Sequence, residues 1–593
     1  MSKKLIFLLF LGLLVRMIFI PVPGFEGDVT FWKSWSLATY DKGIIWLTEN
    51  TTYNYPAGFT LILWLMGKVY SLLADPHNLQ QYWQAGNYLS LLLIKLPSIL
   101  ADLGIAYLIY QLFSRQAKQL DLPVSEKFAQ KLALPLAALY LFHPVVLYDG
   151  VWWGQLDSLG TVFTLLCFYL LVKKQPLWAS VAITTGFLLK MQNIIFLPLF
   201  FLYLWLAFSR QKMVEALAAA LATYLLITLP FSLTGHLSRT FTLITSNFDW
   251  FPLISLNAYN LWWIVSGGHG FTISDKIPIY GLTSAKTLGM LFFAAVYWLA
   301  TILIVRQPKP KNLLLAFTLV TATFFLLVTQ SHERYLFPAL TLVIILLPFL
   351  AKKDHLSWPI WLLFAIFSLT CLINLNNVLT YFYPQNGLPG GQIFALPIVG
   401  LIISYFNLFL FALLLFATSR SLPKAIWLGV PVIIFGGLLL SNFKYLTSNS
   451  ISLTQLSPYM SEQQFSSLQV NRNLVSANGW KNWGFLSANY YFYRHGLATQ
   501  ANSRIVYNLN SHFKRFATDM GIDADGGQEA SVVFEIYGDN KLLYRSGVVR
   551  KFDLPSRTEV SIAGVKNLAL VVNDAGNGPK DDHADWLEPT LYK

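Results

Sequence analysis

Apolar stretches of roughly 18 residues recur through the first 441 residues of this chain, and a helix of that length can cross a lipid bilayer. Hydrophobic residues make up 55% of the 593 residues and charged residues only 12%, whereas soluble domains carry about 25% charged residues. The pattern predicts a polytopic α-helical membrane protein. The first stretch, 5–20, follows Lys3 and Lys4 without a small-residue cleavage site after it, so we expect a retained signal-anchor.

The formal net charge of +13 is distributed as in a membrane protein. Residues 1–441 hold 27 Lys/Arg against 15 Asp/Glu, while residues 442–593 hold 15 against 14. The excess lies in short clusters between apolar stretches, as in the cytoplasmic loops of membrane proteins. The clusters form no continuous stripe that a nucleic acid could follow, so we expect no nucleic-acid partner.

Seven basic clusters predict the topology. Under the positive-inside rule all seven belong on the cytoplasmic side, so an even number of spans must separate consecutive clusters. The apolar stretch 57–74 breaks this parity, and we expect it to lie as a helix on the outer membrane surface. The clusters are Lys3/Lys4, 115–131, Lys173/Lys174, Arg210/Lys212, 306–311, Lys352/Lys353 and Arg420/Lys424.

Thirteen transmembrane helices follow from this parity, and they leave the tail after residue 441 outside the cytoplasm. The chain is therefore expected to be a multi-pass protein of the plasma membrane that faces the cell envelope and contacts membrane lipids. The expected spans are residues 5–20, 89–113, 132–148, 155–172, 177–189, 194–209, 215–233, 286–305, 312–329, 335–350, 357–374, 395–418 and 425–441.

The first expected outer loop opens with an acidic pair, Glu26 and Asp28. Such a pair can simply cap a helix in a solvated loop. However, aromatic residues are dense nearby, among them Trp32 and Tyr55. Aromatic surroundings lower the local dielectric and shield a carboxylate from water, which favours a role as a general base.

Charged residues also fall inside or beside the expected spans. Lys95 and Asp102 are seven residues apart on one helical face, and intramembrane charges usually mark function or mutual pairing. Alternatively, Lys95 could extend to the outer interface, and Arg16 could do the same or bind a phosphate. The segment 149–157 places Asp149, Gln155 and Asp157 around two tryptophans, which indicates a lined cavity or an interfacial belt.

Two further positions carry cations toward the outer face. Lys190 interrupts an apolar run, where it could neutralise an anionic headgroup or simply reach the interface. His332, Glu333 and Arg334 lie in a tight outer loop. The planar Arg334 fork suits a phosphate, although a Glu–Arg ion pair at a turn is the alternative. With one histidine and no second ligand at helical spacing, the loop does not predict a zinc site, and no cofactor motif is present.

Together these residues resemble the GT-C superfamily of glycosyltransferases, multi-span enzymes that take a sugar from a polyprenyl-phosphate carrier. The order of motifs over residues 15–345 is similar to GPI-anchor-mannosyltransferase-like proteins of prokaryotes and, more distantly, to the glucosyltransferases that build lipid-linked oligosaccharide. Six motifs in order on one expected face indicate the superfamily but not the sugar. The motifs are Glu26-Gly27-Asp28, Tyr55-Pro56, Ala101-Asp102-Leu103, Gly154 to Asp157, Lys190 to Pro198 and His332 to Leu336.

The resemblance implies a hexosyltransferase that moves mannose or glucose from a lipid-linked donor to a glycan, lipid or protein acceptor. It implies Asp28 as the catalytic base, assisted by Glu26, with inversion at the sugar carbon. Members of this branch commonly work without a metal, so neither metal nor cofactor is expected. The donor phosphate and sugar would contact residues from the other five motifs, namely Arg334, His332, Glu333, Lys190, Tyr55, Gln155, Asp157 and Asp102.

The composition changes after the last expected span. Residues 442–471 are rich in Ser, Gln and Asn and are interpreted as a linker. Alternating patterns from residue 472 onward predict short strands, as in 504–509 and 530–537. We therefore expect residues 472–593 to form an all-β jelly-roll sandwich.

This tail resembles the NPCBM family of carbohydrate-binding modules. The matching residues are Gly496 to Ser503, Phe516 with 521–523, and Asp582 to Trp586. Gln500 stands where the family usually has a histidine, which puts a histidine-dependent contact in doubt. Alternatively, Trp586 is a core residue and Asp585 caps a turn. The residues that the resemblance assigns to the module's site are Asn502, Asp523, Asp582, His583, Asp585 and Trp586.

Two other functions fit a chain of this kind. A transporter or flippase of lipid-linked sugars would show internal repeats and broken helices in both halves, and the sequence contains no convincing repeat. A membrane scaffold that displays the sandwich would leave Asp28, Asp102, Lys190 and Arg334 without a purpose. The sequence therefore favours the glycosyltransferase, with the flippase as the alternative.

Overall fold

The computed structural model describes residues 2–276, 278–279, 283–352, 354–394, 396–420, 422–447, 449–474, 486–489 and 491–593. Lys353 of one basic cluster and residues 475–485 of the expected sandwich lie outside the described residues. The chain divides into two compact units. The first comprises residues 1–251, 256–268 and 292–431, and the second comprises residues 252–255, 269–291 and 432–593.

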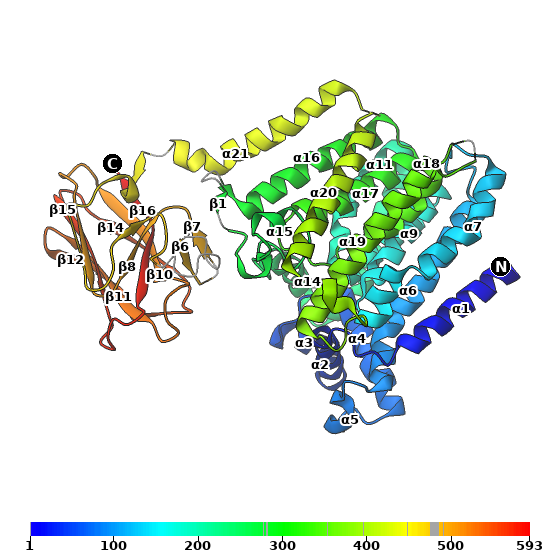
Figure 1. Ribbon diagram of the computed structural model, residues 1–593, viewed down its shortest axis with the longest axis horizontal. Helices are drawn as coiled ribbons and strands as arrows, with labels where there is room; N and C mark the ends of the chain where they lie inside the picture. Colours follow the sequence, from blue (N-terminus) through cyan, green and yellow to red (C-terminus); the bar gives the residue numbers. More distant parts are fainter. Residues whose placement is uncertain are drawn as a thin grey trace. The chain divides into compact units, whose positions relative to one another are not determined.

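Helices make up nearly all of the regular structure before residue 448 (Figure 1). A short hairpin, β1 (Pro278–Ile279) with β2 (Thr283–Ser284), interrupts them. The longer helices are α1 (Lys3–Phe19), α2 (Glu26–Lys42), α4 (Ala57–Leu73), α6 (Tyr88–Arg115), α7 (Glu126–Leu141), α9 (Asp157–Val172), α10 (Pro176–Leu189), α11 (Leu197–Ala207), α12 (Arg210–Ile227), α16 (Ala285–Arg306), α17 (Pro310–Leu327), α18 (Phe337–Leu350), α19 (Trp358–Phe382), α20 (Pro397–Ser419) and α21 (Gly429–Thr447).

Short helical segments join these helices. One of them, η1, is a π-helix, a rare form of helix that is frequent at functional sites. The segments are α3 (Ile44–Asn50), α5 (Leu79–Trp83), α8 (Pro144–Leu147), η1 (Tyr148–Trp153), η2 (Met191–Phe196), α13 (Leu229–Leu233), α14 (Leu237–Thr245), η3 (Ser246–Asp249), α15 (Leu261–Val265), η4 (Gly270–Thr272), η5 (Gly391–Phe394) and η6 (Lys424–Leu428).

Six helices in the described part of the chain are long and apolar enough to cross a membrane, and α7 with the bent segment after it makes a seventh candidate. Each of the thirteen stretches expected as spans overlaps a helix. Several of these helices are shorter than a span, for example α10 and α18. Length and composition therefore support a helical region with six or seven candidate spans.

Helix α4 covers the stretch that the parity argument places on the outer surface. Two of its glycines permit close packing against α10 and α2. A Cβ on Gly58 would lie 2.7 Å from the Leu188 carbonyl oxygen, and one on Gly67 would lie 2.7 Å from that of Ser36. Phe59 and Leu63 are buried on the packed side, while Leu72 is 81% exposed.

The C-terminal domain is an all-β sandwich of two six-stranded sheets. One sheet has the order β14-β10-β16-β8-β5 with β3 also paired to β16, and the other has the order β12-β11-β15-β9-β4 with β13 also paired to β11. The strands are β3 (Ser450–Ser452), β4 (Met460–Gln463), β5 (Gln469–Val470), β8 (Gly496–Gln500), β9 (Ser503–Asn508), β10 (Arg515–Ile522), β11 (Ser531–Gly538), β12 (Lys541–Arg545), β13 (Val549–Arg550), β14 (Ser556–Ser561), β15 (Asn567–Asn573) and β16 (His583–Tyr592), with β6 (Leu486–Ala488) and β7 (Tyr491–Tyr493) as a separate hairpin.

The structure differs from the expected linker over residues 442–471. Helix α21 continues to Thr447, and β3, β4 and β5 belong to the two sheets. Strands β4 and β5 lie at sheet edges, where one side faces solvent and short polar strands are usual. Their Ser- and Gln-rich composition therefore looks like that of a linker.

Trp586 lies between the two sheets and is fully buried. Its ring meets that of Phe534 edge-on, with centroids 4.9 Å apart. Trp586 is thus a core residue, as the alternative interpretation holds, and it cannot stack on a ligand at the surface of the folded domain.

Candidate functional site

The acidic pair lies in the first turn of α2, where the helix dipole favours negative charge. Trp153 donates its indole N–H to the Asp28 carboxylate at 3.1 Å, and Gln155 donates its side-chain amide to the same oxygen. Asn386 donates to the Glu26 carboxylate at 3.0 Å. The two carboxylates therefore have different partners, and Asp28 is the one held against the segment that joins η1 to α9.

The backbone before α2 is fixed on η1. Gly24 has a φ of +72°, and a Cβ there would lie 2.1 Å from the Trp153 carbonyl oxygen. Only glycine fits so close to this backbone. The Phe25 N–H donates to the same carbonyl at 3.1 Å, and the Phe25 ring stacks on the Trp153 ring at 5.1 Å. Local chain geometry thus determines where Asp28 points.

Aromatic rings line the next part of the site, as the sequence predicts. Tyr55 meets Trp32 at 5.0 Å and Phe59 at 5.0 Å between ring centroids. The Lys190 ammonium lies 5.4 Å from the centre of the Tyr55 ring. Tyr55, at the start of the motif before α4, therefore connects the aromatic cluster to the cationic part of the site.

Asp157 is the residue on which two cations converge. It begins α9, and its carboxylate lies 3.2 Å from the Lys190 ammonium and 3.8 Å from Nε of Arg334. All three side chains are nearly inaccessible to solvent, since Asp157 is 3%, Lys190 5% and Arg334 11% exposed. Asp157 is thus shared by two buried cations, and Glu333 supplies a second carboxylate beside Arg334, so each cation has an anionic partner.

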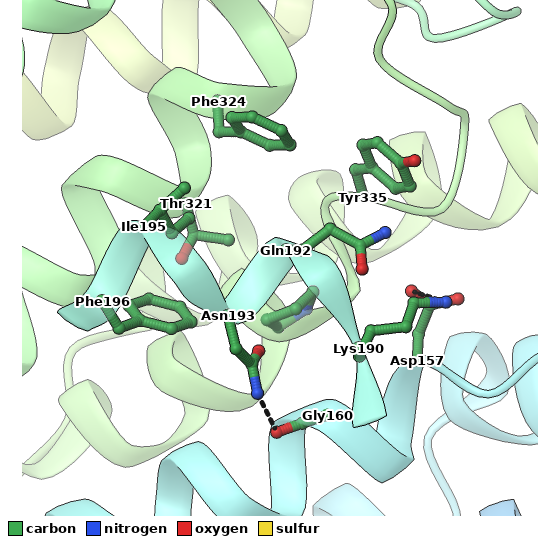
Figure 2. Close-up of a pocket in the computed structure, with 11 residues that line it drawn as sticks. Asp157, Gly160, Lys190, Gln192, Asn193, Ile195, Phe196, Thr321, Phe324 and Tyr335 are labelled. Carbon is green, nitrogen blue, oxygen red and sulfur yellow. Dashed lines mark hydrogen bonds and ion pairs between the residues drawn. The ribbon is translucent and has the colours of Figure 1, made fainter. Parts of the chain in front are cut away.

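Asp157 and Lys190 border a small pocket (Figure 2). In the figure Lys190 extends toward Asp157, and the Gln192 amide and Tyr335 ring lie above them. Asn193 donates to the Gly160 carbonyl at 2.9 Å and fixes the break between α10 and η2. The lining residues are Asp157, Gly160, Lys190, Gln192, Asn193, Ile195, Phe196, Thr321, Phe324, Tyr335 and Pro338.

Arg334 also makes the ion pair that the sequence leaves as an alternative. Its Nη1 lies 2.5 Å from the Glu333 carboxylate and 3.4 Å from Nδ1 of His332. Burial alone would raise the pKa of Glu333, but the Arg334 charge and the His332 hydrogen bond lower it to about 2. Burial, and then the Arg334 charge, lower the pKa of His332. His332 is therefore neutral near pH 7 and can donate a hydrogen bond without adding charge.

Asp102 lies in a different ion pair from that of Asp157. Arg16 donates to its carboxylate at 3.0 Å, and the Tyr140 hydroxyl donates to the other oxygen at 2.9 Å. Lys95 does not pair with Asp102 but donates to three carbonyls at the end of α1 and just after it, including that of Val22 at 2.6 Å. Both Lys95 and Arg16 are fully buried, so neither reaches an interface.

Sequence reasoning missed several residues that shape the site. Asn386 contributes from a loop 360 positions beyond Glu26, and Gln192 and Phe324 line the pocket. Asp149, which the sequence places beside two tryptophans, is fully buried in η1, and its carboxylate oxygens have no hydrogen-bond partner in the described part of the chain. Asparagines are unusual in an apolar stretch such as 373–378, and they could have indicated that α19 donates hydrogen bonds to neighbouring loops, as Asn374 and Asn377 do.

The module residues assigned by resemblance form a mostly buried group in the sandwich. Asp523, Asp582 and Asp585 are at most 1% exposed, whereas Asn502 is exposed. Asp585 lies within β16 opposite Gly521, so it does not cap a turn. The residue that caps a turn is Asp523, whose carboxylate accepts the Asp525 N–H at 2.8 Å. Across the described residues, no group of three or more His, Cys, Asp or Glu side chains could hold a metal ion.

The buried Asp523 and Asp585 predict a pH dependence of the sandwich. Burial raises the pKa of Asp523 to about 7, and burial and the nearby Asp523 raise the pKa of Asp585. A carboxyl group whose pKa is higher in the folded than in the unfolded state contributes fully to stability below about pH 4. That contribution is lost as the pH rises through about 7, where the buried group must ionise. We expect Asp523→Asn, which stays uncharged, to gain stability relative to the native chain from about pH 4 to 8. Amide hydrogen exchange in β10 and β16 of the full chain measures this difference.

A matched control has the opposite sign. Asp539 accepts the backbone N–H groups of Asn567 at 2.9 Å and Lys566 at 3.1 Å, and these bonds lower its pKa. Its contribution to stability is present above about pH 4 and lost on acidification. Asp539→Asn should therefore lose stability relative to the native chain as the pH rises. The same pH trend for both variants would contradict the role given to Asp523.

Comparison with known proteins bears on the C-terminal domain. Residues 449–592 match the NPCBM/NEW2 domain family. No curated protein matches the chain. Among solved structures, the chain is similar to CBM51 from Clostridium perfringens GH95 in complex with methyl-galactose, at 28% identity over 24% of this chain and 99% of that chain, with a TM-score of 0.22.

Two other solved structures overlap the same quarter of the chain. CBM51-2 in complex with GlcNAc and INT domains from Clostridium perfringens ZmpB is 28% identical over 31% of that chain, with a TM-score of 0.22. The tandem CBM51 modules of Sp3GH98 from Streptococcus pneumoniae SP3-BS71 are 18% identical over 47% of that chain, with a TM-score of 0.22. On the family match, the C-terminal domain of this chain is an NPCBM/NEW2 domain.

Proposed function

We propose that this protein is an integral-membrane glycosyltransferase of GT-C type. It transfers a hexose, mannose or glucose, from a polyprenyl-phosphate carrier to an extracytoplasmic glycan, lipid or protein acceptor. The observation that carries the proposal is the convergence of Lys190 and Arg334 on Asp157, which borders a small pocket. Gln155, two positions before Asp157, donates to the Asp28 carboxylate.

Each part of this arrangement has a chemical role in such a transfer. The leaving group is a lipid phosphate, and buried cations stabilise its developing charge more strongly than water does. Lys190 and Arg334 take that role, with neutral His332 as a further donor. Asp28 accepts the proton of the attacking acceptor hydroxyl, while Glu26 holds the turn through Asn386. A single base that activates a direct attack inverts the configuration at the sugar carbon.

Membrane insertion accounts for the surface of the helices. Large apolar side chains are exposed along α1 and α20, such as Phe7 at 66%, Ile18 at 70% and Phe409 at 57%. Exposed apolar surface on this scale is unusual in soluble monomers and suits lipid. We infer that the thirteen-span topology in the plasma membrane applies, with the shorter helices completing the bundle and the NPCBM domain in the cell envelope.

The NPCBM domain suits a glycan partner. Asn502 is the assigned module residue that is exposed, and its side-chain oxygen accepts the backbone N–H of Asp574 at 3.0 Å. We infer that the domain holds the glycan acceptor or product near the membrane, which raises its local concentration.

Transfer from synthetic polyprenyl-phosphate mannose and polyprenyl-phosphate glucose by the purified protein in proteoliposomes tests the proposal. We expect a glycosylated product from one donor, with inverted configuration at the sugar carbon. A product of retained configuration would exclude a single-base mechanism. Movement of the lipid-linked sugar between leaflets without any transfer would favour the flippase instead.

A further inference from the structure

The turn between β13 and β14 presents two large apolar side chains on the surface of the sandwich. Phe552 is 63% and Leu554 66% exposed. Two such side chains at the tip of one turn are unfavourable in water, because each would gain by burial. Their position therefore indicates a partner that covers them.

The turn is built so that these side chains cannot fold inward. The Asp553 carboxylate accepts the Arg550 N–H at 2.8 Å, and the Asp553 N–H donates to the Arg550 carbonyl at 3.0 Å. Between them, Lys551 is buried and its ammonium donates to the carbonyls of Asp523 at 2.7 Å and Gly526 at 2.9 Å. Anchored on both sides, the turn holds Phe552 outward in a fixed geometry.

Basic residues flank the apolar tip. Arg550 and Arg557 are exposed on either side of it, and Arg557 lies 3.4 Å from the Asp519 carboxylate. The acid between the two arginines, Asp553, is engaged in closing the turn. Apolar side chains beside exposed basic residues are the pattern of segments that rest in the headgroup region of an anionic bilayer.

The size of the patch favours a membrane over a protein. A stable protein–protein interface buries about 800 Å² on each partner, and the side chains of one short turn cover far less. A bilayer needs no shaped pocket, because apolar side chains enter it wherever they meet it. In the described part of the same chain, six helices have the length and apolar composition of membrane spans.

We propose that the turn 550–557 is a membrane anchor of the NPCBM domain, with Phe552 and Leu554 inserted among lipid chains and Arg550 and Arg557 against anionic headgroups. The anchor rests on the membrane insertion proposed above and is independent of sugar transfer. It keeps the domain at the bilayer surface, where a lipid-linked sugar is presented.

Depth-dependent fluorescence quenching in the full-length protein tests this anchor. The protein is placed in nanodiscs with anionic lipid, after the buried Cys167 and Cys371 are replaced by alanine. An environment-sensitive dye on the single cysteine of the Phe552→Cys variant should be quenched severalfold by nitroxide-labelled lipid. Asn540→Cys is the matched control in the same domain. Strand β13, which leads into the turn, pairs with the start of β11, whereas Asn540 follows the end of β11, so the two labelled sites lie at opposite ends of this strand.

Two more variants complete the experiment. Phe7→Cys on the exposed face of α1 reports insertion of the helices. The double variant Arg550→Glu/Arg557→Glu should reduce quenching at position 552 severalfold. The control Lys541→Glu/Lys566→Glu makes the same change of charge at the other end of the domain and should leave quenching at position 552 unchanged.

The outcomes separate the two proposals. Quenching at positions 7 and 552 but not 540 supports the anchor. Quenching at position 7 with equal, weak signals at 552 and 540 overturns the anchor and leaves membrane insertion standing. Absence of quenching at position 7 overturns membrane insertion and the anchor with it.

Discussion

Replacing Asp28 by asparagine is expected to lower the rate of sugar transfer about 10²- to 10⁴-fold, the usual contribution of a general base. Asparagine keeps the shape of the side chain and an oxygen that can still accept from Trp153 and Gln155. It cannot accept a proton from the acceptor hydroxyl. The loss should therefore appear in kcat, with KM for the donor little changed, in single-turnover assays with labelled polyprenyl-phosphate sugar.

Glu26→Gln is the matched control for this prediction. It removes the neighbouring carboxylate but keeps an oxygen that can accept from Asn386. We expect a loss of less than about 10-fold, because Glu26 supports the turn and does not take the proton. Equal losses in the two variants, or native turnover in Asp28→Asn, would remove Asp28 as the base.

Replacing Arg16 by methionine is expected to destabilise the helical unit by about 3–5 kcal/mol, the cost of leaving one partner of a buried ion pair alone. Arg16 is fully buried, and both Nε and Nη2 lie 3.0 Å from the same Asp102 oxygen. Without it, Tyr140 remains as the hydrogen-bond donor to a buried carboxylate. Thermal unfolding of the purified protein in detergent measures the change.

The double variant Arg16→Met/Asp102→Leu separates pairing from packing. Replacing both charges by apolar side chains of similar volume is often neutral, so we expect the double variant to be more stable than either single variant. Additive losses would show that the two side chains act independently and that the pair is not the source of the destabilisation.

Local sequence patterns predicted the elements of this protein well. The apolar stretches correspond to helices because their hydrophobicity persists over many turns, as in 89–113 and α6. The alternation in 530–537 corresponds to β11, which pairs on both sides. The short edge strands β4 and β5 escaped prediction, since two to four polar residues hold too little periodicity to separate them from a linker.

The site was predicted as a set of residues but not as a set of contacts. The motifs named Asp157, Lys190 and Arg334 separately, and the structure brings them together. The same reasoning grouped Asp102 with them, although its partner is Arg16 on α1. Helical spacing relates residues within one element, and it carries no information on which distant element faces them.

The sequence by itself determined a helical region of apolar segments followed by a β-sandwich, because hydrophobic periodicity and turn residues act over short distances. The tertiary structure alone decided which charges pair, since buried ions take whichever partner the packing brings within about 4 Å. It decided that Lys95 holds the carbonyls after α1, that Asn386 supports Glu26, and that Trp586 belongs to the core. Each of these depends on contacts between residues far apart in the chain, which no local pattern encodes.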